Sequence, residues 1–253
     1  MLCLRIEAAF AAFRTFTAGV YRPTAPFLTP SAAYGLLLNV AGIDSREDDG
    51  KSPMTLMRSN LPRAEIALGP INFPAVHTLY QQLHNYPVGI TGKERAVECK
   101  GTKYNIQPVR REFLSGIQGY VCMRGNDSLE SQVRSGLAGA GRPDGIPRYG
   151  IPFLGDNSFM VDVLREEAPP RQLAYWYRSM ARLEPGKAGR HVRLTAWIDR
   201  ADQTRTVARL YEPAEKPSSG PPEDEAAWTV VEPPAEVTMS STERPRKRGR
   251  MNG

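Results

Sequence analysis

The chain has 253 residues, of which 41% are hydrophobic, and a formal net charge of +6. This length suffices for one large domain, or a domain with appendages, that buries a core of its own. No apolar run approaches the roughly 20 residues that a membrane helix needs, and the first residues lack the pattern of a secretory signal. We therefore expect a cytoplasmic protein that has no membrane partner.

The charge is divided unevenly along the chain. Residues 1–211 hold 27 Lys and Arg against 19 Asp and Glu, and residues 212–242 hold one Lys against seven acids. Residues 243–253 hold five basic residues against one acid. The first part is therefore more basic than the total suggests. A basic body favours a polyanionic partner, although charge alone does not separate nucleic-acid binders from other Arg-rich proteins.

Cysteine usage argues against two kinds of site. The three cysteines, Cys3, Cys99 and Cys122, are odd in number and lack the spacing of metal ligands. These features speak against a disulfide framework and against a zinc site. We expect buried free thiols.

The first predicted elements are a strand at residues 2–8 and a helix soon after it. In LCLRIEA, apolar residues alternate with period two, which is typical of a strand. The helix has Thr29 as its N-cap, Pro30 at its first position and apolar residues at helical spacing. Gly42 is placed to end it.

A second strand and a long excursion follow. After an acidic loop, residues 62–69 predict the strand. The stretch from Leu83 to Leu114 contains turn signals at Pro and Gly residues and has a net charge of +3. We interpret it as a protruding β-hairpin.

Three further elements follow, a strand, a helix and a strand, at residues 117–125, 127–139 and 158–164. Asp127 and Glu130 indicate a capping box at the start of the helix. The order strand, helix, strand, strand, helix, strand is that of a ferredoxin-like unit, which RNA-recognition modules also use. We predict an α+β, ferredoxin-like (RRM-like) βαββαβ domain over residues 1–165.

Beyond residue 165 the helical signal fades, and strand patterns predict a small β-rich annex over residues 166–211. Residues 212–240 have the acidic, Pro-rich composition of a linker, with room for one short strand in WTVVEPP. We expect the tail, residues 241–253, to be disordered. Its PRKRGR run is either a nucleic-acid contact or a solubilising end.

KYNIQPVRREF, residues 103–113, interleaves cations with aromatic residues. Cations grip phosphates and aromatic rings stack on unpaired bases, as recognition of single-stranded RNA requires. The candidate RNA contacts in this stretch are Lys103, Tyr104, Arg110 and Arg111. The alternative is a solvated basic hairpin.

Arg14 and Arg22 lie in loops near the first strand and helix, where they could neutralise phosphates. Small residues at the helix start, Ser31 among them, leave its backbone N–H groups open to an anion. In an RNA-binding protein, a phosphate would sit between Arg22 and this helix end. Alone, either arginine would be an ordinary surface residue.

RYGIPFLGDN, residues 148–157, sets two glycines around an apolar centre. A glycine-bearing loop can bring its backbone close to a phosphate, so Arg148, Gly150 and Gly155 are candidate RNA contacts. The competing interpretation is a plain structural turn. Because the loop is not a GxGxxG fingerprint and no P-loop lysine follows, we expect no nucleotide cofactor.

The three histidines lack the spacing of a zinc helix, and no nucleophile motif or pair of carboxylates is evident. We expect no metal, no cofactor and no catalytic residue. One catalytic alternative remains, a metal-independent endoribonuclease that processes precursor RNA. His84, Tyr86 and either Lys93 or Lys103 would supply its base, acid and cation.

Four segments together resemble one known family: LCLRIEA, TAPFLTPSAAYGLLLNVAG, KYNIQPVRREFL and RYGIPFLGDN. Over about residues 2–165 the sequence is similar to the fifth CRISPR-associated protein family, of the RAMP superfamily. Its members are ferredoxin-fold subunits that cap the foot of type I Cascade complexes. The resemblance rests on the combination of motifs rather than on any one of them.

The resemblance implies a non-catalytic, RNA-binding subunit of a type I CRISPR Cascade surveillance complex, for RNA-guided DNA targeting in antiviral defence or in a CRISPR-associated transposon. It implies binding of the crRNA 5′ handle, and contacts with the first backbone subunit and with the large subunit near the protospacer-adjacent motif (PAM) of the target DNA. In the family a β-hairpin thumb kinks the RNA. Residues 83–114 are the stretch long and basic enough to form it.

Overall fold

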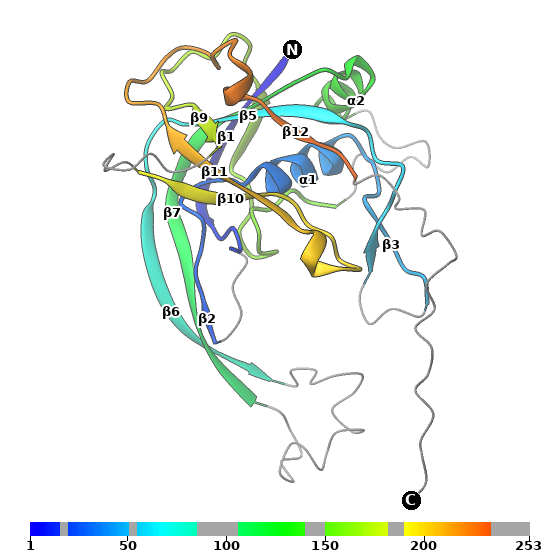
Figure 1. Ribbon diagram of the computed structural model, residues 1–253, viewed down its shortest axis with the longest axis vertical. Helices are drawn as coiled ribbons and strands as arrows, with labels where there is room; N and C mark the ends of the chain where they lie inside the picture. The colour runs from blue at the N-terminus through cyan, green and yellow to red at the C-terminus, as the bar shows by residue number, and fades with distance from the viewer. Residues whose placement is uncertain (16–19, 51–54, 85–105, 140–149, 182–189, 234–253) are drawn as a thin grey trace, which may run out of the picture.

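The computed structural model describes residues 1–15, 20–50, 55–84, 106–139, 150–181 and 190–233 (Figure 1). This part of the chain is a mixed α/β structure, mostly sheet, with two α-helices. Neither helix is long and apolar enough to cross a membrane.

The elements in the first half of the chain are β1 (Leu2–Ala11), β2 (Tyr21–Arg22), α1 (Pro30–Val40), β3 (Arg46–Glu47), β4 (Leu56–Met57), β5 (Ala64–Pro70), β6 (Ala75–His84) and β7 (Ile106–Arg124). The later elements are α2 (Asp127–Leu137), β8 (Val163–Glu166), β9 (Tyr177–Met180), β10 (Val192–Trp197), β11 (Val207–Pro213) and β12 (Thr229–Val231), with 3-10 turns at Gln203–Arg205 and Glu225–Ala227.

A seven-stranded sheet forms the centre of the molecule. Five of its strands run in the antiparallel order β12-β5-β7-β1-β8, while β6 and β2 pair with the outer half of β7. β1 and β5 confirm the strands predicted at residues 2–8 and 62–69. The strand predicted at residues 117–125 is the inner end of β7, which is 19 residues long.

Local signals place the ends of α1 correctly. Thr29 is the N-cap, Pro30 is the first helical residue, and Gly42 follows the helix with a φ of 73°. Seven of its eleven residues are buried: Pro30, Ala33, Tyr34, Leu36, Leu37, Leu38 and Val40. Such a helix is apolar nearly all round because it lies between the main sheet and the annex strands (Figure 1).

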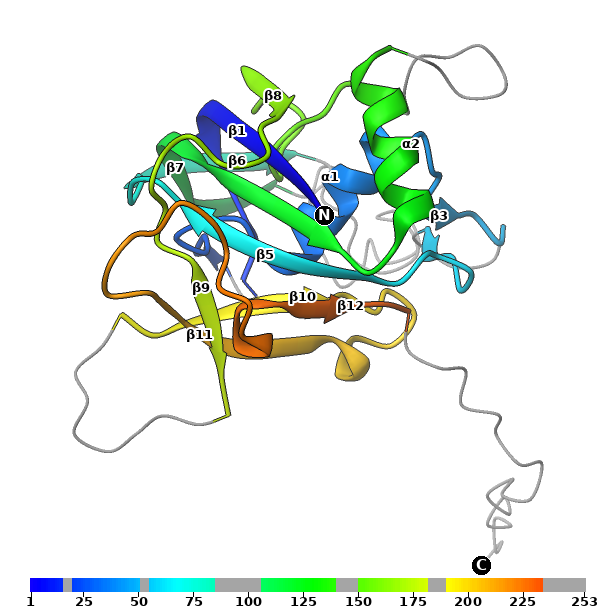
Figure 2. The same cartoon turned by 90° about the horizontal axis from the view of Figure 1, so that it is seen from above.

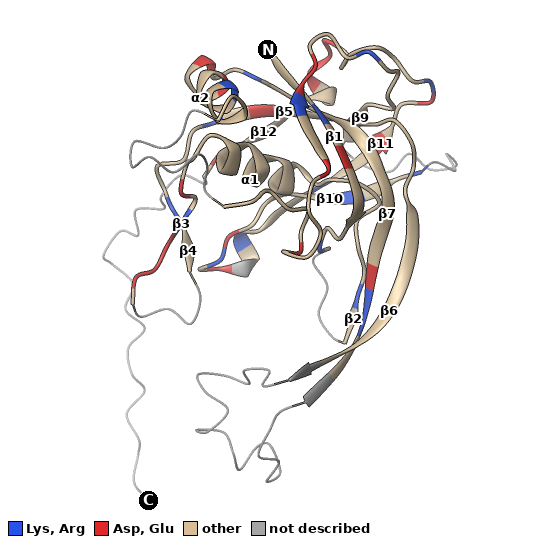
Figure 3. Cartoon of the chain, turned by 180° about the vertical axis from the view of Figure 1, so that it is seen from behind, with Lys and Arg blue, Asp and Glu red and all other residues tan. Residues whose placement is uncertain are grey.

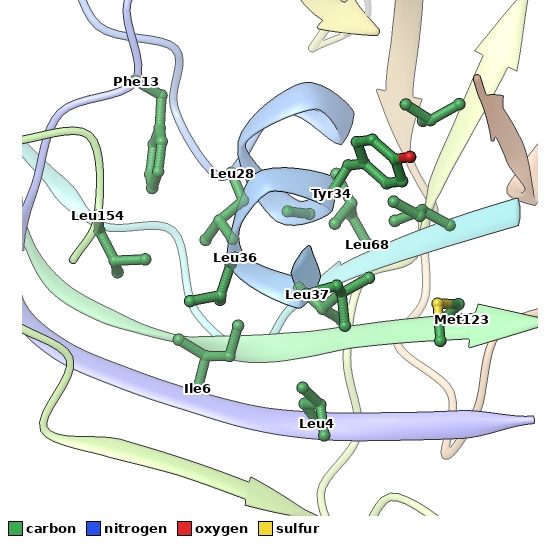
Figure 4. Close-up of a cluster of buried hydrophobic side chains, with 14 of the residues drawn as sticks. Leu4, Ile6, Phe13, Leu28, Tyr34, Leu36, Leu37, Leu68, Met123 and Leu154 are labelled. Atoms are coloured by element: carbon green, nitrogen blue, oxygen red, sulfur yellow. The ribbon is translucent and has the colours of Figure 1, made fainter. Parts of the chain in front are cut away.

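One hydrophobic core joins the main sheet, α1 and the annex. Figure 4 shows Leu4 and Ile6 of β1 below the apolar side chains of α1. The annex strands β9, β10 and β11 contribute to the same cluster through Tyr177, Leu194, Trp197 and Tyr211. Figure 2 shows these strands beside β5, with β8 at the other edge of the main sheet. The annex is thus packed on the first 165 residues as part of one folded body.

Residues 214–231, within the stretch interpreted as a linker, are packed as well. Ser218 and Ala174 exchange two backbone hydrogen bonds of 3.0 Å, and β12 extends the main sheet at β5, which confirms the short strand expected in WTVVEPP. Trp228 is only 6% exposed and donates its indole N–H to the Pro222 carbonyl. Composition indicated a solvated chain, but Trp228 provides apolar surface that anchors the segment.

Two boundaries differ from the prediction. The N-cap of α2 is Asn126, whose side chain accepts a 2.9 Å hydrogen bond from the Leu129 N–H. The predicted capping box is therefore wrong, since Asp127 lies inside the first turn. The last strand of the pattern, β8, begins at Val163 instead of residue 158, because the preceding residues form a tight loop.

Cys3 and Cys122 form a disulfide, so the expectation of free thiols is wrong for this pair. The two residues are direct partners in β1 and β7, with Cα atoms 4.0 Å apart, although 119 positions separate them in the sequence. The register of β1 and β7 brings the two cysteines together. Their spacing along the sequence therefore could not predict the disulfide. Cys99 lies outside the described residues.

β6 and the outer half of β7 form a long two-stranded arm that curves away from the body, with β2 beside it (Figure 1). Pairing runs from Ala75 opposite Ser115 to His84 opposite Ile106. The hairpin expected from Leu83 therefore begins at Ala75, and residues 85–105 lie outside the described part. Below, "the arm" means β2, β6 and residues 106–115 of β7.

Candidate nucleic-acid interface

A cleft of about 1320 Å³ opens along the side of α1 that carries Ser31 and Gly35. One wall comes from residues 12–15 and the loop at 150–160, and the other from residues 43–46 and the turn after β10. Small side chains on this side of α1 leave room for the cleft. Five of the ten predicted RNA contacts line it: Arg14, Arg22, Ser31, Gly150 and Gly155.

Local pairing holds Arg14 and Arg22 at the cleft. Arg14 forms an isolated bridge with Thr24, whose hydroxyl accepts a 2.8 Å hydrogen bond from the Phe13 N–H. Arg22 lies in β2, opposite Arg111 of β7. Arg14 is exposed and Arg22 is half-buried. Arg22 therefore belongs both to the cleft and to the arm.

The start of α1 offers fewer open donors than the sequence predicts. The Thr29 hydroxyl accepts a 3.2 Å hydrogen bond from the Ala32 N–H, and Pro30 has no N–H to offer. The Ala33 N–H donates to the Thr29 carbonyl at 2.9 Å. The Ser31 hydroxyl lies 3.1 Å from that of Thr29. An anion at this helix end would meet the Ser31 side chain rather than a row of open backbone donors.

Two arginines missed by the sequence analysis, Arg46 and Arg200, line the far wall of the cleft. Arg200 donates to the Thr55 carbonyl at 2.6 Å, and its burial, with the nearby charge of Arg46, lowers its pKa. Asp44 and Asp199 lie on the same wall, so its charge is mixed. The wall with Arg14 carries only basic charge among the described lining residues.

Arg111 is engaged inside the protein. Its Nη1 lies 2.5 Å from Asp156 Oδ2, and its guanidinium carbon lies 5.7 Å from the ring centroid of Phe159. Burial would raise the pKa of Asp156, but hydrogen bonds from Ser158 and Arg111 outweigh it and lower the pKa from 3.8 to about 2. Arg111 thus fastens the arm to the loop at 150–160.

Arg110 projects from the opposite face of β7, because consecutive residues of a strand alternate. It is exposed, and its guanidinium carbon lies 5.9 Å from the ring centroid of Tyr21. Figure 3 shows basic residues on β2 and on the adjoining part of β7, next to an acidic one. Arg110 and Arg111, predicted as equivalent contacts, therefore have different surroundings.

The two glycines of the cleft wall differ in how tightly they are packed. Both have positive φ angles, 74° at Gly150 and 82° at Gly155. A Cβ at Gly155 would lie 1.7 Å from the Ala12 carbonyl oxygen, whereas a Cβ at Gly150 would meet no atom within 4 Å. Packing of the loop on the end of β1 therefore accounts for Gly155, which favours the structural turn at that position.

Lys103, Tyr104 and Arg148 lie outside the described residues, as do Tyr86 and Lys93 of the nuclease alternative. The structure therefore does not test that alternative. Within the described ranges, no group of three or more His, Cys, Asp and Glu side chains could hold a metal ion.

The sheet face opposite α1 is covered by the chain's own C-terminal part. Trp176 and Trp228 pack there with Tyr120 and the Cys3–Cys122 disulfide, and Trp176 is completely buried. RNA-recognition modules stack bases on an open face of this kind. That face is closed here, so the basic cleft and the arm are the candidate interfaces on the described surface.

The family model described as CRISPR-associated protein (Cas_Cas5) matches residues 1–140, more than half of the chain. The chain therefore belongs to this family of CRISPR-associated proteins, which confirms the resemblance noted in the sequence. No curated protein matches the chain.

Two solved structures extend the comparison. A chain described as "CRISPR RNA-guided surveillance complex" has a TM-score of 0.53 and 14% identity, over 86% of this chain and 91% of that chain. A chain described as "Crystal structure of Cas protein" has a TM-score of 0.42 and 18% identity, over 87% of this chain and 99% of that chain. The first likeness concerns the fold alone, and the second score is too low to support an argument.

Proposed function

We propose that the protein is a non-catalytic, RNA-binding subunit of a type I CRISPR Cascade surveillance complex, and that it caps the crRNA 5′ handle for RNA-guided DNA targeting. Its family and its fold, similar to that of a chain from a CRISPR RNA-guided surveillance complex, support a role in such a complex. The observation that carries RNA binding is the basic cleft wall, where Arg14 and Arg22 gather beside the arm.

In this proposal the RNA backbone follows the basic wall of the cleft and passes onto the arm. Arg22 is common to both surfaces, and Arg14 lies on the same wall. Cations in such positions bind phosphates regardless of sequence and fix the register of the strand. The arm would be the base of the thumb predicted at residues 83–114.

The proposal includes a ferredoxin-like core. The strands run in the order β5-β7-β1-β8, with α1 between β1 and β5 in the chain and α2 between β7 and β8. That succession is βαββαβ. Residues 1–165 would form the RAMP domain and residues 166–211 the annex. We also propose that the protein contacts the first backbone subunit, and the large subunit near the PAM. The complex would act in the cytoplasm.

Fluorescence anisotropy with a labelled RNA tests the proposal. The purified chain, free and within the assembled complex, is titrated with the repeat-derived 5′ handle and with a scrambled RNA of equal composition. We expect tighter binding of the handle. Equal affinity for both RNAs, free and assembled, would overturn the proposal.

Two variants locate the contact. Arg14→Gln removes a cation from the cleft and should weaken handle binding. Arg178→Gln is the matched control, because Arg178 is exposed, pairs with Asp224 and does not line the cleft.

A separate experiment tests the proposal that the protein is not a nuclease. Precursor RNA incubated with the protein in EDTA should stay intact, and specific cleavage would favour the endoribonuclease.

A further inference from the structure

Strand pairing places three residues from distant parts of the sequence in one row across the arm. Tyr80 of β6 and Tyr21 of β2 both lie directly opposite Arg110 of β7. Directly paired residues project from the same face of a sheet. Tyr80 is 66% exposed and Tyr21 is 45% exposed, so the row presents two aromatic rings and a guanidinium to solvent.

One end of the row is fixed in place. The Tyr21 hydroxyl donates to Glu112, which follows Arg110 by two residues on the same face of β7. The second oxygen of Glu112 accepts a 2.9 Å hydrogen bond from the Thr24 N–H. The bond to Glu112, with burial, raises the pKa of Tyr21, so the phenol stays neutral and keeps its donor. A ring held in this way loses little entropy on binding.

The guanidinium of Arg110, in the middle of the row, is available to bind an anion. Within the described residues Arg110 has no ion pair, and its contact is with the face of the Tyr21 ring. Glu112, the nearest acid along the strand, is already engaged by Tyr21 and Thr24. The row therefore combines aromatic faces with a cation that has no carboxylate partner in this part of the chain.

The other face of the arm is occupied. Phe113 lies opposite His77, and their rings stack with centroids 5.1 Å apart. Phe10 and Phe159 pack on Phe113 with centroids 5.7 and 6.2 Å away, and Asp156 holds Arg111. Aromatic and basic side chains on that face serve the fold. On the opposite face, the side chains of Tyr80 and Arg110 are exposed.

We infer that the row Tyr80, Arg110 and Tyr21 is a stacking platform for an unpaired base of the bound RNA. This inference rests on the proposed function and adds the kind of nucleotide contact that the arm makes. Neighbouring strands lie roughly 4.8 Å apart, so the backbones of Tyr21 and Tyr80 are roughly 10 Å apart, on either side of Arg110. A base stacked on a tyrosine brings its phosphate within reach of Arg110. A docking protein would need an acid there, and the basic cleft wall next to the arm favours a polyanion.

Variants at Tyr80 test the platform with the 5′ handle RNA. Tyr80→Ala removes an aromatic face and is expected to weaken binding roughly 5- to 100-fold. Tyr80→Phe keeps the ring and should bind as the wild type does. Leu173→Ala, which trims a 56% exposed side chain outside the arm, is the control and should have no effect. Melting curves verify that all variants fold.

Two further measurements distinguish stacking from a loss of general affinity. Tyr80→Trp should retain binding, and its added emission should be quenched by RNA. Abasic nucleotides are then introduced one by one. At the stacked position, removal of the base and Tyr80→Ala should each weaken binding, but the two effects should not add.

The outcomes separate this inference from the proposed function. A wild-type chain that does not distinguish the handle from scrambled RNA defeats the proposed function, and the platform with it. Normal handle binding by Tyr80→Ala, with unchanged Tyr80→Trp emission, defeats the platform alone. In that case the row is a surface for a protein neighbour, and Tyr80→Ala should reduce assembly of the complex instead.

Discussion

Arg111 of the arm and Asp156 of the loop at 150–160 form an ion pair, with Nη1 2.5 Å from Oδ2. The pair joins segments that lie 45 positions apart in the sequence. Ser158 also donates to the Asp156 carboxylate through its backbone N–H at 2.9 Å. The shape of the cleft therefore depends on an interaction that begins in the arm.

Replacing Asp156 by Asn should destabilise the protein at neutral pH. The pKa of Asp156 is lowered from 3.8 to about 2, so its ionised form favours the folded state. The stabilisation is present above pH 4 and is lost as the pH falls towards 2. We expect Asp156→Asn to cost roughly 1–2 kcal/mol in urea unfolding at pH 7. The difference from the wild type should shrink as the pH falls below 4 and vanish below pH 2, and a constant difference would contradict this assignment.

Removing charge at Arg110 and at Arg111 should have different effects on RNA binding. Arg110→Gln is expected to weaken binding and to reduce the slope of log affinity against log salt by roughly 1, as loss of one phosphate contact requires. Arg111→Gln should mainly lower the melting temperature, because it releases Asp156. Anisotropy between 50 and 200 mM salt, a range in which phosphate contacts show clearly, measures both slopes. An unchanged slope for Arg110→Gln would exclude it as a contact.

The different surroundings of Arg110 and Arg111 could not be predicted from the sequence. The pattern of residues 103–113 suggested RNA contacts, and both arginines were candidates. Which face of β7 each one takes depends on strand register, and what covers a face depends on distant segments such as the loop with Asp156. For the same reason the sequence did not indicate Tyr21 and Tyr80 as a pair, since only their pairing with β7 brings them together.

Features encoded by neighbouring residues were predictable. Thr29, Pro30 and Gly42 defined α1, because caps and helix ends are local chemistry. The α2 cap was misplaced by one residue, because Asn126 and Asp127 are both good cap residues. The Cys3–Cys122 disulfide and the packing of residues 214–228 depend on contacts across the chain, and no local signal indicated them.

Gly155→Ala should destabilise the protein much more than Gly150→Ala. Both positions have positive φ, so each substitution strains the backbone by about 1 kcal/mol. At Gly155 the new Cβ would also collide with the Ala12 carbonyl, and moving the loop adds roughly 1–3 kcal/mol. Urea unfolding of the two variants gives the comparison. Equal losses would show that the loop moves freely away from β1.

Reduction of the Cys3–Cys122 disulfide should lower the melting temperature. The crosslink closes a loop of 119 residues, and removal of a disulfide typically costs roughly 2–5 kcal/mol. Dithiothreitol should therefore destabilise the wild type but not Cys3→Ala. Thiol titration of the denatured chain checks the bond directly, since only Cys99 should react. Three reactive thiols in protein kept under cytoplasmic conditions would show that the pair is reduced there.

The C-terminal part of the chain should divide into a segment needed for folding and one that is not. Trp228 is 6% exposed, its ring lies 4.2 Å from the Arg124 guanidinium carbon, and β12 follows it directly. Trp228→Ala should cost roughly 3–5 kcal/mol, because it empties a site on the sheet face opposite α1. Deletion of residues 243–253 is expected to leave the melting temperature unchanged and to weaken RNA binding only slightly. Thermal melting and anisotropy of the two variants test this division, and a large loss of assembly on deletion would reveal a role for the basic tail.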